Sequence, residues 1–257
     1  VCLALVLSRG GSYFADKAFE TTKSKIQCQT EDVAGCGDVT SDVKVLLTGD
    51  SHAWHFGATL EKISQKEHWH MTMLGLGACA PLLTDGASNM LLIGKRKQAC
   101  QQQRDYLRDN HEQYQFIFLA ARWDSVFKEE GFANVFRNTL ETLSKSKAKV
   151  FVIAQVPMFK ENGTKIAFLN QRYGLDVPVS NVVQPVYKEA NEMIKGLVDQ
   201  YPEVNYIDVN AMFCNEAECS NYIGGEFAYI DNNHLNIWAA KKLEPEMYKQ
   251  IINALEQ

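Results

Sequence analysis

The sequence predicts an α/β fold in which one parallel sheet lies between two layers of helices. Five short runs rich in Val, Ile, Leu and Phe alternate along the chain with longer amphipathic stretches. Each run is almost continuously apolar, as expected of parallel strands that are buried on both faces. The chain has 257 residues, 46% of them apolar and 22% charged, which suits one large globular domain of this kind.

The apolar runs place the predicted strands, and the amphipathic stretches place the helices that connect them. Strands are expected at residues 44–48, 70–76, 116–121, 149–156 and 204–209. Helices are expected at residues 53–67, 95–111, 132–147, 185–201 and 236–255. Asn236 is a residue type that caps helix N-termini, so we expect it to cap the last helix. Residues 157–183 are long for a connection in such a fold, and they form either a flap over the site or a surface insertion.

Residues 1–41 lack this regular alternation. We expect them to form a membrane-proximal segment and linker, with a helix at residues 13–25, and the catalytic domain to occupy residues 42–257. The apolar run at residues 1–7 is far shorter than the roughly 20 residues that span a bilayer, and it lacks the features of a signal peptide. It is either a short buried strand or the end of a transmembrane helix, and we favour a domain cut from a longer membrane protein.

Six of the seven cysteines fall into three close pairs: Cys28 and Cys36, Cys79 and Cys100, and Cys214 and Cys219. No C-x-x-C motif is present and no His stands at zinc-finger spacing, so a structural zinc site is not expected. We favour three local disulfides formed in an oxidising compartment, and the alternative is a set of buried free thiols. The net charge of −5 does not favour a nucleic-acid partner.

Three residues at opposite ends of the predicted domain have the chemistry of a serine nucleophile and its base. Ser51 follows the first predicted strand, at the edge where ligands bind in open α/β sheets. Asp231 and His234 lie together before the last helix. His234 is expected to take the serine proton, and Asp231 to orient the imidazole. The alternatives are that Asp50 and Ser51 only cap a helix and that the Asp–His pair makes a local contact. A metal site is not expected, because no further ligands cluster nearby.

These segments resemble the SGNH (GDSL-type) hydrolases. Residues 45–53 (VLLTGDSHA) are similar to the first block of that family, and residues 231–235 (DNNHL) to its last, D-x-x-H, block. Residues 75–82 with Cys100, and residues 118–123 (FLAARW), resemble the SGNH domain that is fused to membrane acyltransferase-3 proteins. The resemblance covers about residues 42–257. It implies a three-layer α/β/α sandwich with a flavodoxin-like, five-stranded parallel sheet, and acyl chemistry on Ser51.

The resemblance also implies an extracytoplasmic O-acyltransferase, in the simplest case an O-acetyltransferase. Its acceptor is expected to be a hydroxyl of a bacterial cell-surface polysaccharide, such as lipopolysaccharide O-antigen. An N-terminal transmembrane acyltransferase-3 domain of the same chain would supply the acyl group, derived from acetyl-CoA, and the SGNH domain itself would bind no cofactor. The domain is expected to be monomeric and to lie at the periplasmic or extracellular face of the inner membrane. The alternatives are a stand-alone SGNH carbohydrate esterase and a non-catalytic saccharide-binding domain.

The third block departs from the usual SGNH pattern, and the departure affects the oxyanion hole. Ordinary SGNH hydrolases have an Asn in this block, whereas this chain has Arg122 and Trp123. The expected donors to the oxyanion are the backbone N–H of Ser51 and a donor from Gly75 or Gly77, of which we favour Gly77 because it lies further past the strand. Arg122 is a further candidate. Trp123 and His52 are candidate substrate-binding residues; the alternative for both is packing.

Overall fold

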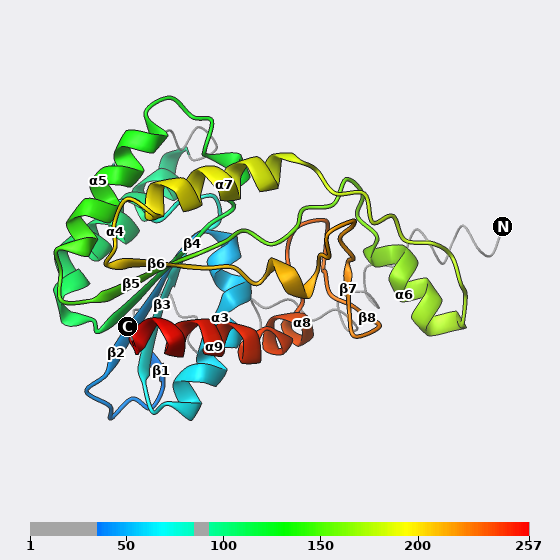
Figure 1. Ribbon diagram of the computed structural model, residues 1–257, viewed down its shortest axis with the longest axis horizontal. Helices are drawn as coiled ribbons and strands as arrows, with labels where there is room; N and C mark the ends of the chain where they lie inside the picture. The colour runs from blue at the N-terminus through cyan, green and yellow to red at the C-terminus, as the bar shows by residue number, and fades with distance from the viewer. Residues whose placement is uncertain (1–34, 85–92, 257) are drawn as a thin grey trace.

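The computed structural model describes residues 35–84 and 93–256, and it has the predicted arrangement of a sheet between two helical layers (Figure 1). The six strands of the sheet are arranged in the order β1-β3-β2-β4-β5-β6. Their bounds are β1 (Gly35–Gly37), β2 (Lys44–Gly49), β3 (His70–Gly75), β4 (Phe116–Ala120), β5 (Lys149–Ile153) and β6 (Val204–Ile207). The helix predicted at residues 13–25 lies outside the described residues.

The five predicted strands are β2 to β6, and neighbouring members of this set pair in parallel. Numbered in chain order, these strands run 2-1-3-4-5 across the sheet, which is the flavodoxin-like order. The sheet has six strands instead of the predicted five, because β1 adds to its edge antiparallel to β3. Two of the three residues of β1 are glycines, so this strand has no apolar pattern that would reveal it.

Helices cover both faces of the sheet. On one face lie α3 (Ser51–Lys66), α8 (Ile237–Lys242) and α9 (Glu244–Leu255), and on the other lie α4 (Gly94–Asn110), α5 (Phe132–Ser144) and α7 (Val186–Val198) (Figure 1). In β2, Val45 and Leu47 join the core on the α3 side, whereas Leu46 joins the core on the α5 side. Successive strand residues point to opposite faces, so two covered faces require a continuous apolar run.

The last predicted helix is interrupted. α8 ends at Lys242 and α9 begins at Glu244, with Pro245 in its first turn. Proline is tolerated in a first turn because it has no N–H to donate there, but inside a helix it would break the backbone hydrogen bonds. The C-terminal helical segment therefore consists of two helices.

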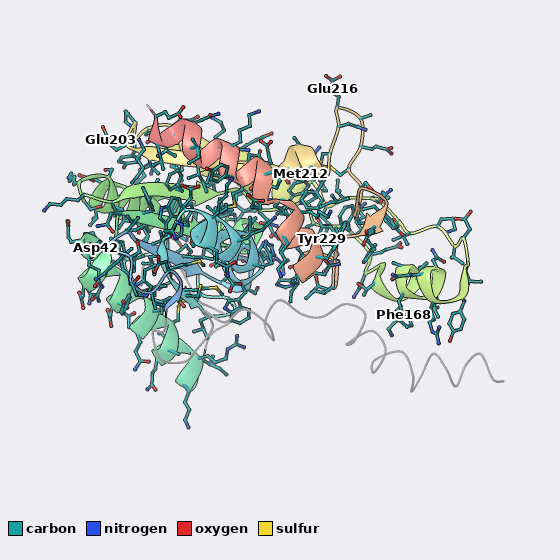
Figure 2. The ribbon with its side chains drawn as sticks, turned by 90° about the horizontal axis from the view of Figure 1, so that it is seen from below. Asp42, Phe168, Glu203, Met212, Glu216 and Tyr229 are labelled. Atoms are coloured by element: carbon teal, nitrogen blue, oxygen red, sulfur yellow. A yellow bond between two sulfur atoms is a disulfide. The ribbon has the colours of Figure 1, made fainter. Side chains whose placement is uncertain are left out.

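The long connection at residues 157–183 contains α6 (Thr164–Tyr173). This helix projects from the body of the domain in both ribbon views, and Figure 2 labels its Phe168. The remaining short elements are the hairpin of β7 (Tyr222–Ile223) and β8 (Glu226–Phe227) and the 3-10 turns η3 (His111–Gln113), η4 (Trp123–Ser125) and η5 (Asn210–Met212). No helix within residues 35–84 and 93–256 is long and apolar enough to cross a bilayer.

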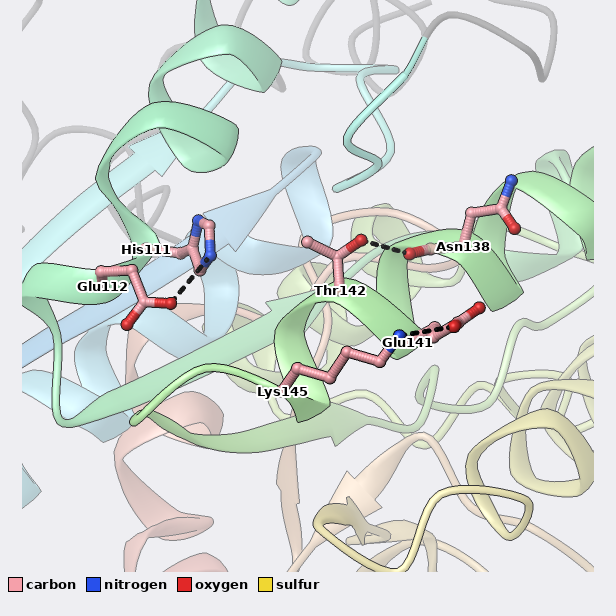
Figure 3. Close-up of a pocket in the computed structure, with 6 residues that line it drawn as sticks. All are labelled: His111, Glu112, Asn138, Glu141, Thr142 and Lys145. Atoms are coloured by element: carbon pink, nitrogen blue, oxygen red, sulfur yellow. Dashed lines mark hydrogen bonds and ion pairs between the residues drawn. The ribbon is translucent and has the colours of Figure 1, made fainter.

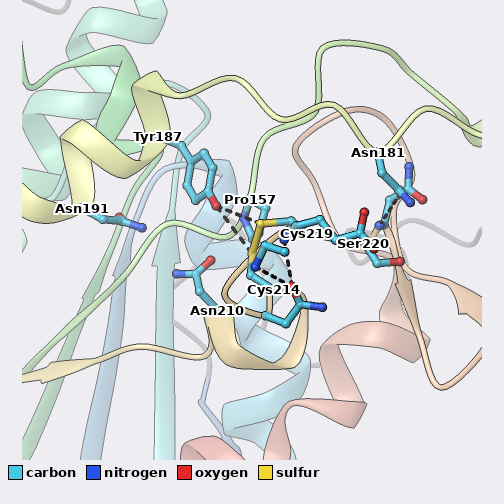
Figure 4. Close-up of a disulfide and its surroundings, with 12 residues drawn as sticks. Pro157, Asn181, Tyr187, Asn191, Asn210, Cys214, Cys219 and Ser220 are labelled. Carbon is cyan, nitrogen blue, oxygen red and sulfur yellow. Dashed lines mark hydrogen bonds between the residues drawn. A yellow bond between two sulfur atoms is a disulfide. The ribbon is translucent and has the colours of Figure 1, made fainter.

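Two of the three predicted disulfides are confirmed, Cys79–Cys100 and Cys214–Cys219. The hydroxyl of Tyr187 lies 3.4 Å from Cys219 Sγ and 3.6 Å from Cys214 Sγ, where it donates to the second bridge (Figure 4). Cys36 is also disulfide-bonded, and its predicted partner Cys28 lies outside the described residues. The paired-cysteine prediction thus holds wherever both members are described.

Candidate active site

Ser51 lies at the first position of α3, directly beyond the carboxyl end of β2. The neighbours of β2 are β3 on one side and β4 on the other, so the chain changes direction at this point of the sheet and leaves a crevice for a ligand. Gly49 makes the turn possible. Its φ is +153°, and a Cβ at this position would collide with the carbonyl oxygen of Ala120 in β4.

Asp50 fixes the turn between β2 and α3. One carboxylate oxygen caps the helix by accepting the N–H of His52 at 2.8 Å, and the other accepts the N–H of Arg122 at 2.8 Å. Burial raises the pKa of Asp50 to about 6, although both backbone N–H groups favour its ionised form. The residue before Ser51 is thereby tied to the end of β4.

The structure brings Ser51, His234 and Asp231 into one hydrogen-bond chain. His234 Nε2 lies 2.7 Å from Ser51 Oγ, and His234 Nδ1 lies 2.7 Å from Asp231 Oδ2. With its proton on Nδ1, the imidazole donates to Asp231 and accepts the serine O–H. This is the geometry that a serine nucleophile, its base and an orienting carboxylate require.

The loop that carries Asp231 also holds its carboxylate in place. Asp231 Oδ1 accepts the backbone N–H groups of Asn233 at 2.8 Å and of His234 at 2.7 Å. Burial raises the pKa of Asp231, but the hydrogen bond and charge of His234 and the two backbone donors outweigh it and hold the pKa below its usual value. Asp231 is therefore an anion at neutral pH.

His52 is buried, which favours packing over substrate binding for this side chain. Its Nε2 lies 3.1 Å from Asn233 Oδ1, so it supports the loop that carries His234. The ring of His55 lies 4.7 Å from that of His52. Burial lowers the pKa of His52 to about 3 and that of His55 well below its usual value, so both are neutral beside His234 at pH 7.

Trp123 is also buried, which favours packing, the alternative to substrate binding. Its indole N–H donates to the carbonyl of Ile153 at 2.8 Å, which satisfies the one polar group of the side chain inside the core. The guanidinium of Arg122 donates to both oxygens of Asp124, at 3.1 and 3.2 Å, and it contacts the sulfur of Met158. Arg122 thus reaches the site through its backbone N–H on Asp50, while Asp124 holds its side chain.

Two backbone N–H groups at the site have no acceptor within the described residues, those of Ser51 and Gly77. Ser51 is at the helix N-terminus, and Gly77 lies in the turn that follows β3. The turn is tied to the Ser51 strand, because the N–H of Leu76 donates to the carbonyl of Gly49 at 3.1 Å. The indole of Trp54, one helical turn after Ser51, fills the space that a side chain at Gly75 would need. Both predicted backbone donors are therefore available to an oxyanion.

Sequence reasoning missed the supporting roles of Asn232 and Asn233, and for Asp50 it gave the helix cap but not the hydrogen bond to Arg122. Asn232 exchanges two hydrogen bonds with Phe159: its carbonyl accepts the Phe159 N–H at 2.8 Å, and its side-chain amide donates to the Phe159 carbonyl at 3.1 Å. The base of the 157–183 connection thus adjoins the loop of His234, while α6 projects away from the body. All three residues lie inside the two sequence motifs, at positions 50, 232 and 233. Their place next to Ser51 and between Asp231 and His234 is the sequence feature that could have revealed them.

The hollow shown in Figure 3 lies elsewhere on the molecule. It has a volume of about 420 Å³ and is lined by His111, Glu112, Asn138, Glu141, Thr142 and Lys145. These residues precede β4 and β5 in the chain, so the hollow is at the amino edge of the sheet, opposite Ser51. In the described part of the chain, no group of three or more His, Cys, Asp or Glu side chains is arranged to hold a metal ion.

Comparison with known proteins places this geometry in a family. Among solved structures, the periplasmic domain of the lipopolysaccharide acetyltransferase of Salmonella ser. Paratyphi A is similar, with a TM-score of 0.69 and 15% identity. The alignment covers 95% of this chain and 98% of that domain. An acetyl xylan esterase is also similar, with a TM-score of 0.49, 14% identity and coverage of 80% of this chain and 98% of the esterase. No curated protein sequence gives a significant match.

The sequence model of one family, described as "SGNH domain (fused to AT3 domains)", matches residues 16–249. The match spans most of the chain and includes the segments of Ser51, Asp231 and His234. The fold agrees with it, because the periplasmic domain of the lipopolysaccharide acetyltransferase shares this α/β arrangement. The chain therefore belongs to the family of SGNH domains that are fused to AT3 domains.

Proposed function

We propose that this domain is an extracytoplasmic O-acyltransferase that transfers an acyl group, in the simplest case acetyl, to a hydroxyl of a bacterial cell-surface polysaccharide. The observation that carries the proposal is the hydrogen-bond chain from Asp231 through His234 to Ser51. It is the arrangement needed for acyl chemistry, and it occurs in a domain whose family is fused to acyltransferase-3 (AT3) domains.

The first half-reaction would form an acyl-enzyme. Ser51 Oγ attacks the carbonyl carbon of the acyl donor while His234 Nε2 takes the serine proton, and Asp231 stabilises the resulting imidazolium. The oxyanion accepts hydrogen bonds from the backbone N–H groups of Ser51 and Gly77. Its collapse breaks the bond to the donor's leaving group, which takes the proton from His234.

The second half-reaction would pass the acyl group to the saccharide. An acceptor hydroxyl gives its proton to His234 Nε2 and attacks the carbonyl carbon of the acyl-enzyme. The second tetrahedral intermediate collapses to the saccharide ester, and Ser51 Oγ leaves with the proton from His234. The site is thereby restored without a further reactant.

Several observations support the location and the partners in this proposal. AT3 fusion supports a membrane domain in the parent chain that delivers the acyl group, with acetyl-CoA as its source. The two described disulfides and the bonded Cys36 fit an oxidising compartment such as the periplasm. The similar fold of a lipopolysaccharide acetyltransferase domain supports a surface polysaccharide as the acceptor.

Hydrolysis is the second candidate function, because the reacting atoms are open to water. The side chains of His234 and Asp231 are 25% and 34% exposed. Water that replaces the saccharide in the second half-reaction would make the domain a carbohydrate esterase with the same residues in the same roles. Acceptor choice alone separates the two functions.

The test compares the wild-type protein with Ser51→Ala and, as a control, with Ser144→Ala at the distant end of α5. Turnover of 4-nitrophenyl acetate by the purified domain is expected to vanish only in Ser51→Ala, because no other group can form the acyl-enzyme. In cells that produce the full-length parent, the same variant is expected to abolish O-acylation of the polysaccharide. Wild-type modification by Ser51→Ala would contradict the proposal. Loss of existing acetyl groups from a polysaccharide would favour the esterase, and no turnover together with no phosphonate labelling of Ser51 would favour a non-catalytic saccharide-binding domain.

A further inference from the structure

α4 presents three side chains on one face to the strand ends that flank Ser51. Arg96, Cys100 and Gln103 are spaced by four and three residues, which places them on the same side of a helix. Gln103 donates to the carbonyl of Gly49 at 2.9 Å, two residues before the nucleophile. α4 therefore contacts the end of β2 itself.

The other two side chains hold the turn that follows β3. Arg96 Nη2 donates to the carbonyl of Gly77 at 3.0 Å, and Cys100 forms a disulfide with Cys79. Both cysteines are fully buried, and Leu76 packs against their bridge. One helix thus anchors the turn at residues 76–79 by a covalent bond and by a charged hydrogen bond.

The backbone of this turn is one that needs such anchoring. Ala78 has a φ of +66°, in the left-handed region that residues other than glycine rarely adopt. A conformation of this kind persists when the surrounding structure determines it, and it is concentrated at functional sites. Ala78 packs against the disulfide, and the N–H of Cys79 closes the turn on the carbonyl of Leu76 at 2.9 Å.

We propose that α4 positions the oxyanion hole: through Arg96 and the Cys79–Cys100 disulfide it holds the turn at residues 76–79 so that the Gly77 N–H faces the developing oxyanion. The inference rests on the proposed function and extends it to residues that never touch substrate. This chain lacks the usual Asn donor, and the guanidinium of Arg122 is held by Asp124. The two backbone N–H groups are then the donors that stabilise the negative charge of the tetrahedral intermediate. Their position therefore affects the rate of acyl transfer.

The main test removes the bridge with the double variant Cys79→Ala/Cys100→Ala. Two quantities are measured at 20 °C: kcat/KM for 4-nitrophenyl acetate, and the inhibition constant of phenylboronic acid, whose tetrahedral adduct on Ser51 places an oxygen in the hole. Misplacement of one donor is expected to lower kcat/KM about 10- to 100-fold and to weaken the boronic acid by the same factor. Titration of Ser51 with a phosphonate is expected to count the same fraction of folded sites as in the wild type.

Cys214→Ala/Cys219→Ala is the matched control, because it removes another buried bridge that does not touch the turn. It is expected to lower the melting temperature and to leave kcat/KM and the inhibition constant unchanged. A purely stabilising role for Cys79–Cys100 predicts the same result for both double variants.

Arg96 provides an independent test that does not depend on the disulfide. Arg96→Ala is expected to lower kcat/KM about fivefold, the worth of one ordinary hydrogen bond, and Arg96→Lys to restore part of it. The neighbouring exposed Lys97→Ala is expected to change nothing. If the Cys79/Cys100 variant does not fold, the comparison of Arg96→Ala with Lys97→Ala tests whether α4 positions the turn.

The outcomes separate this inference from the proposed function. If Ser51→Ala abolishes turnover but the Cys79/Cys100 and Arg96 variants keep wild-type kcat/KM and boronic-acid affinity, the inference is wrong and the proposed function stands. If Ser51→Ala retains turnover, the proposed function fails, and the inference fails with it.

Discussion

Gly49 and Ser51 are two residues apart, and the structure requires them for different physical reasons. In the proposed function Ser51 supplies the reactive oxygen. Gly49 is needed because it has no side chain where β2 approaches β4. Most substitutions at Ser51 would therefore leave the fold intact, and most substitutions at Gly49 would not.

Two glycine-to-alanine variants are expected to change stability in opposite directions. Gly49→Ala forces the strands apart at the Ala120 carbonyl, so its melting temperature and its turnover should both fall. Gly196 lies inside α7 with open space around it, so Gly196→Ala should raise the free energy of unfolding by about 0.5–1 kcal/mol. Thermal unfolding of both variants checks this, and a stable, active Gly49→Ala protein would contradict the account of the turn.

His55 is expected to make the protein sensitive to acid. Both of its ring nitrogens are buried without a hydrogen-bond partner in the described structure, and burial holds its pKa well below the usual value. The folded state therefore keeps His55 neutral while the unfolded state binds a proton below about pH 6.5. Stability is then lost as the pH falls below that value, by about 1.4 kcal/mol per pH unit for this residue.

His55→Leu tests this pH dependence, because leucine fills the buried site and cannot titrate. The variant should gain about 2 kcal/mol more stability over the wild type at pH 5 than at pH 7.5 in urea denaturation. The raised pKa of Asp50 acts in the opposite direction, but it is present in both proteins and cancels in the comparison. The exposed His68→Leu is the control. Equal gains at the two pH values would show that His55 is already protonated in the folded state.

At the level of single residues, the sequence identified three side chains that the structure joins by hydrogen bonds, but it did not settle the burial of two of their neighbours. Ser51, Asp231 and His234 could be found because their residue types and spacing are tied to one kind of chemistry. Trp123 and His52 stand beside reactive positions in the chain, but which way a side chain points at a strand end depends on packing. Their burial is a tertiary property that no local pattern contains.

Among the elements, α8 shows how a short helix positions the loop that carries His234. Asn236 caps the helix by accepting the N–H of Ala239 at 2.8 Å, as predicted, and its amide donates to the carbonyl of Phe227 at 2.8 Å. The same side chain thus joins the helix to the β7–β8 hairpin. His234 lies two residues earlier and is held between these two elements.

Asn236 variants are expected to separate the cap from the link to the hairpin. Asn236→Ala loses both, so the free energy of unfolding should fall by about 1–2 kcal/mol for the cap alone, and turnover should fall because His234 shifts. Asn236→Ser keeps an acceptor for the helix N–H and should recover most of the cap energy. Urea denaturation and turnover of 4-nitrophenyl acetate measure both effects, and equal stability of the two variants would rule out the capping contribution.

Elements with a clear apolar pattern in the sequence were predictable. Elements that form because of their tertiary contacts were not. The five parallel strands lie within a few residues of their predicted bounds because both of their faces are buried. β1 exists because β3 offers a free edge, and α6 lies in a stretch that gave no periodic signal. The break between α8 and α9 did have a signal, Pro245, which the pattern of the longer segment concealed.

For the whole molecule, the paired cysteines make oxidation state a measurable property of the folded chain. After secretion to the periplasm, six of the seven cysteines are expected to resist alkylation until a reductant is added, leaving one thiol. Intact-mass analysis of denatured protein, with and without reduction, counts the modified sites. Alkylation of all seven without reductant would remove the argument for an oxidising compartment.

The hydrogen bond between His234 and Ser51 joins residues 183 positions apart. Ser51 leaves the ribosome well before His234, and domains fold as units once their non-local contacts can form. A nascent or prematurely terminated chain that already contains the nucleophile therefore has no base to activate it. In the proposed function, the domain therefore becomes reactive only after the segment of His234 has been made, and chains that end before His234 are not expected to form an acyl-enzyme.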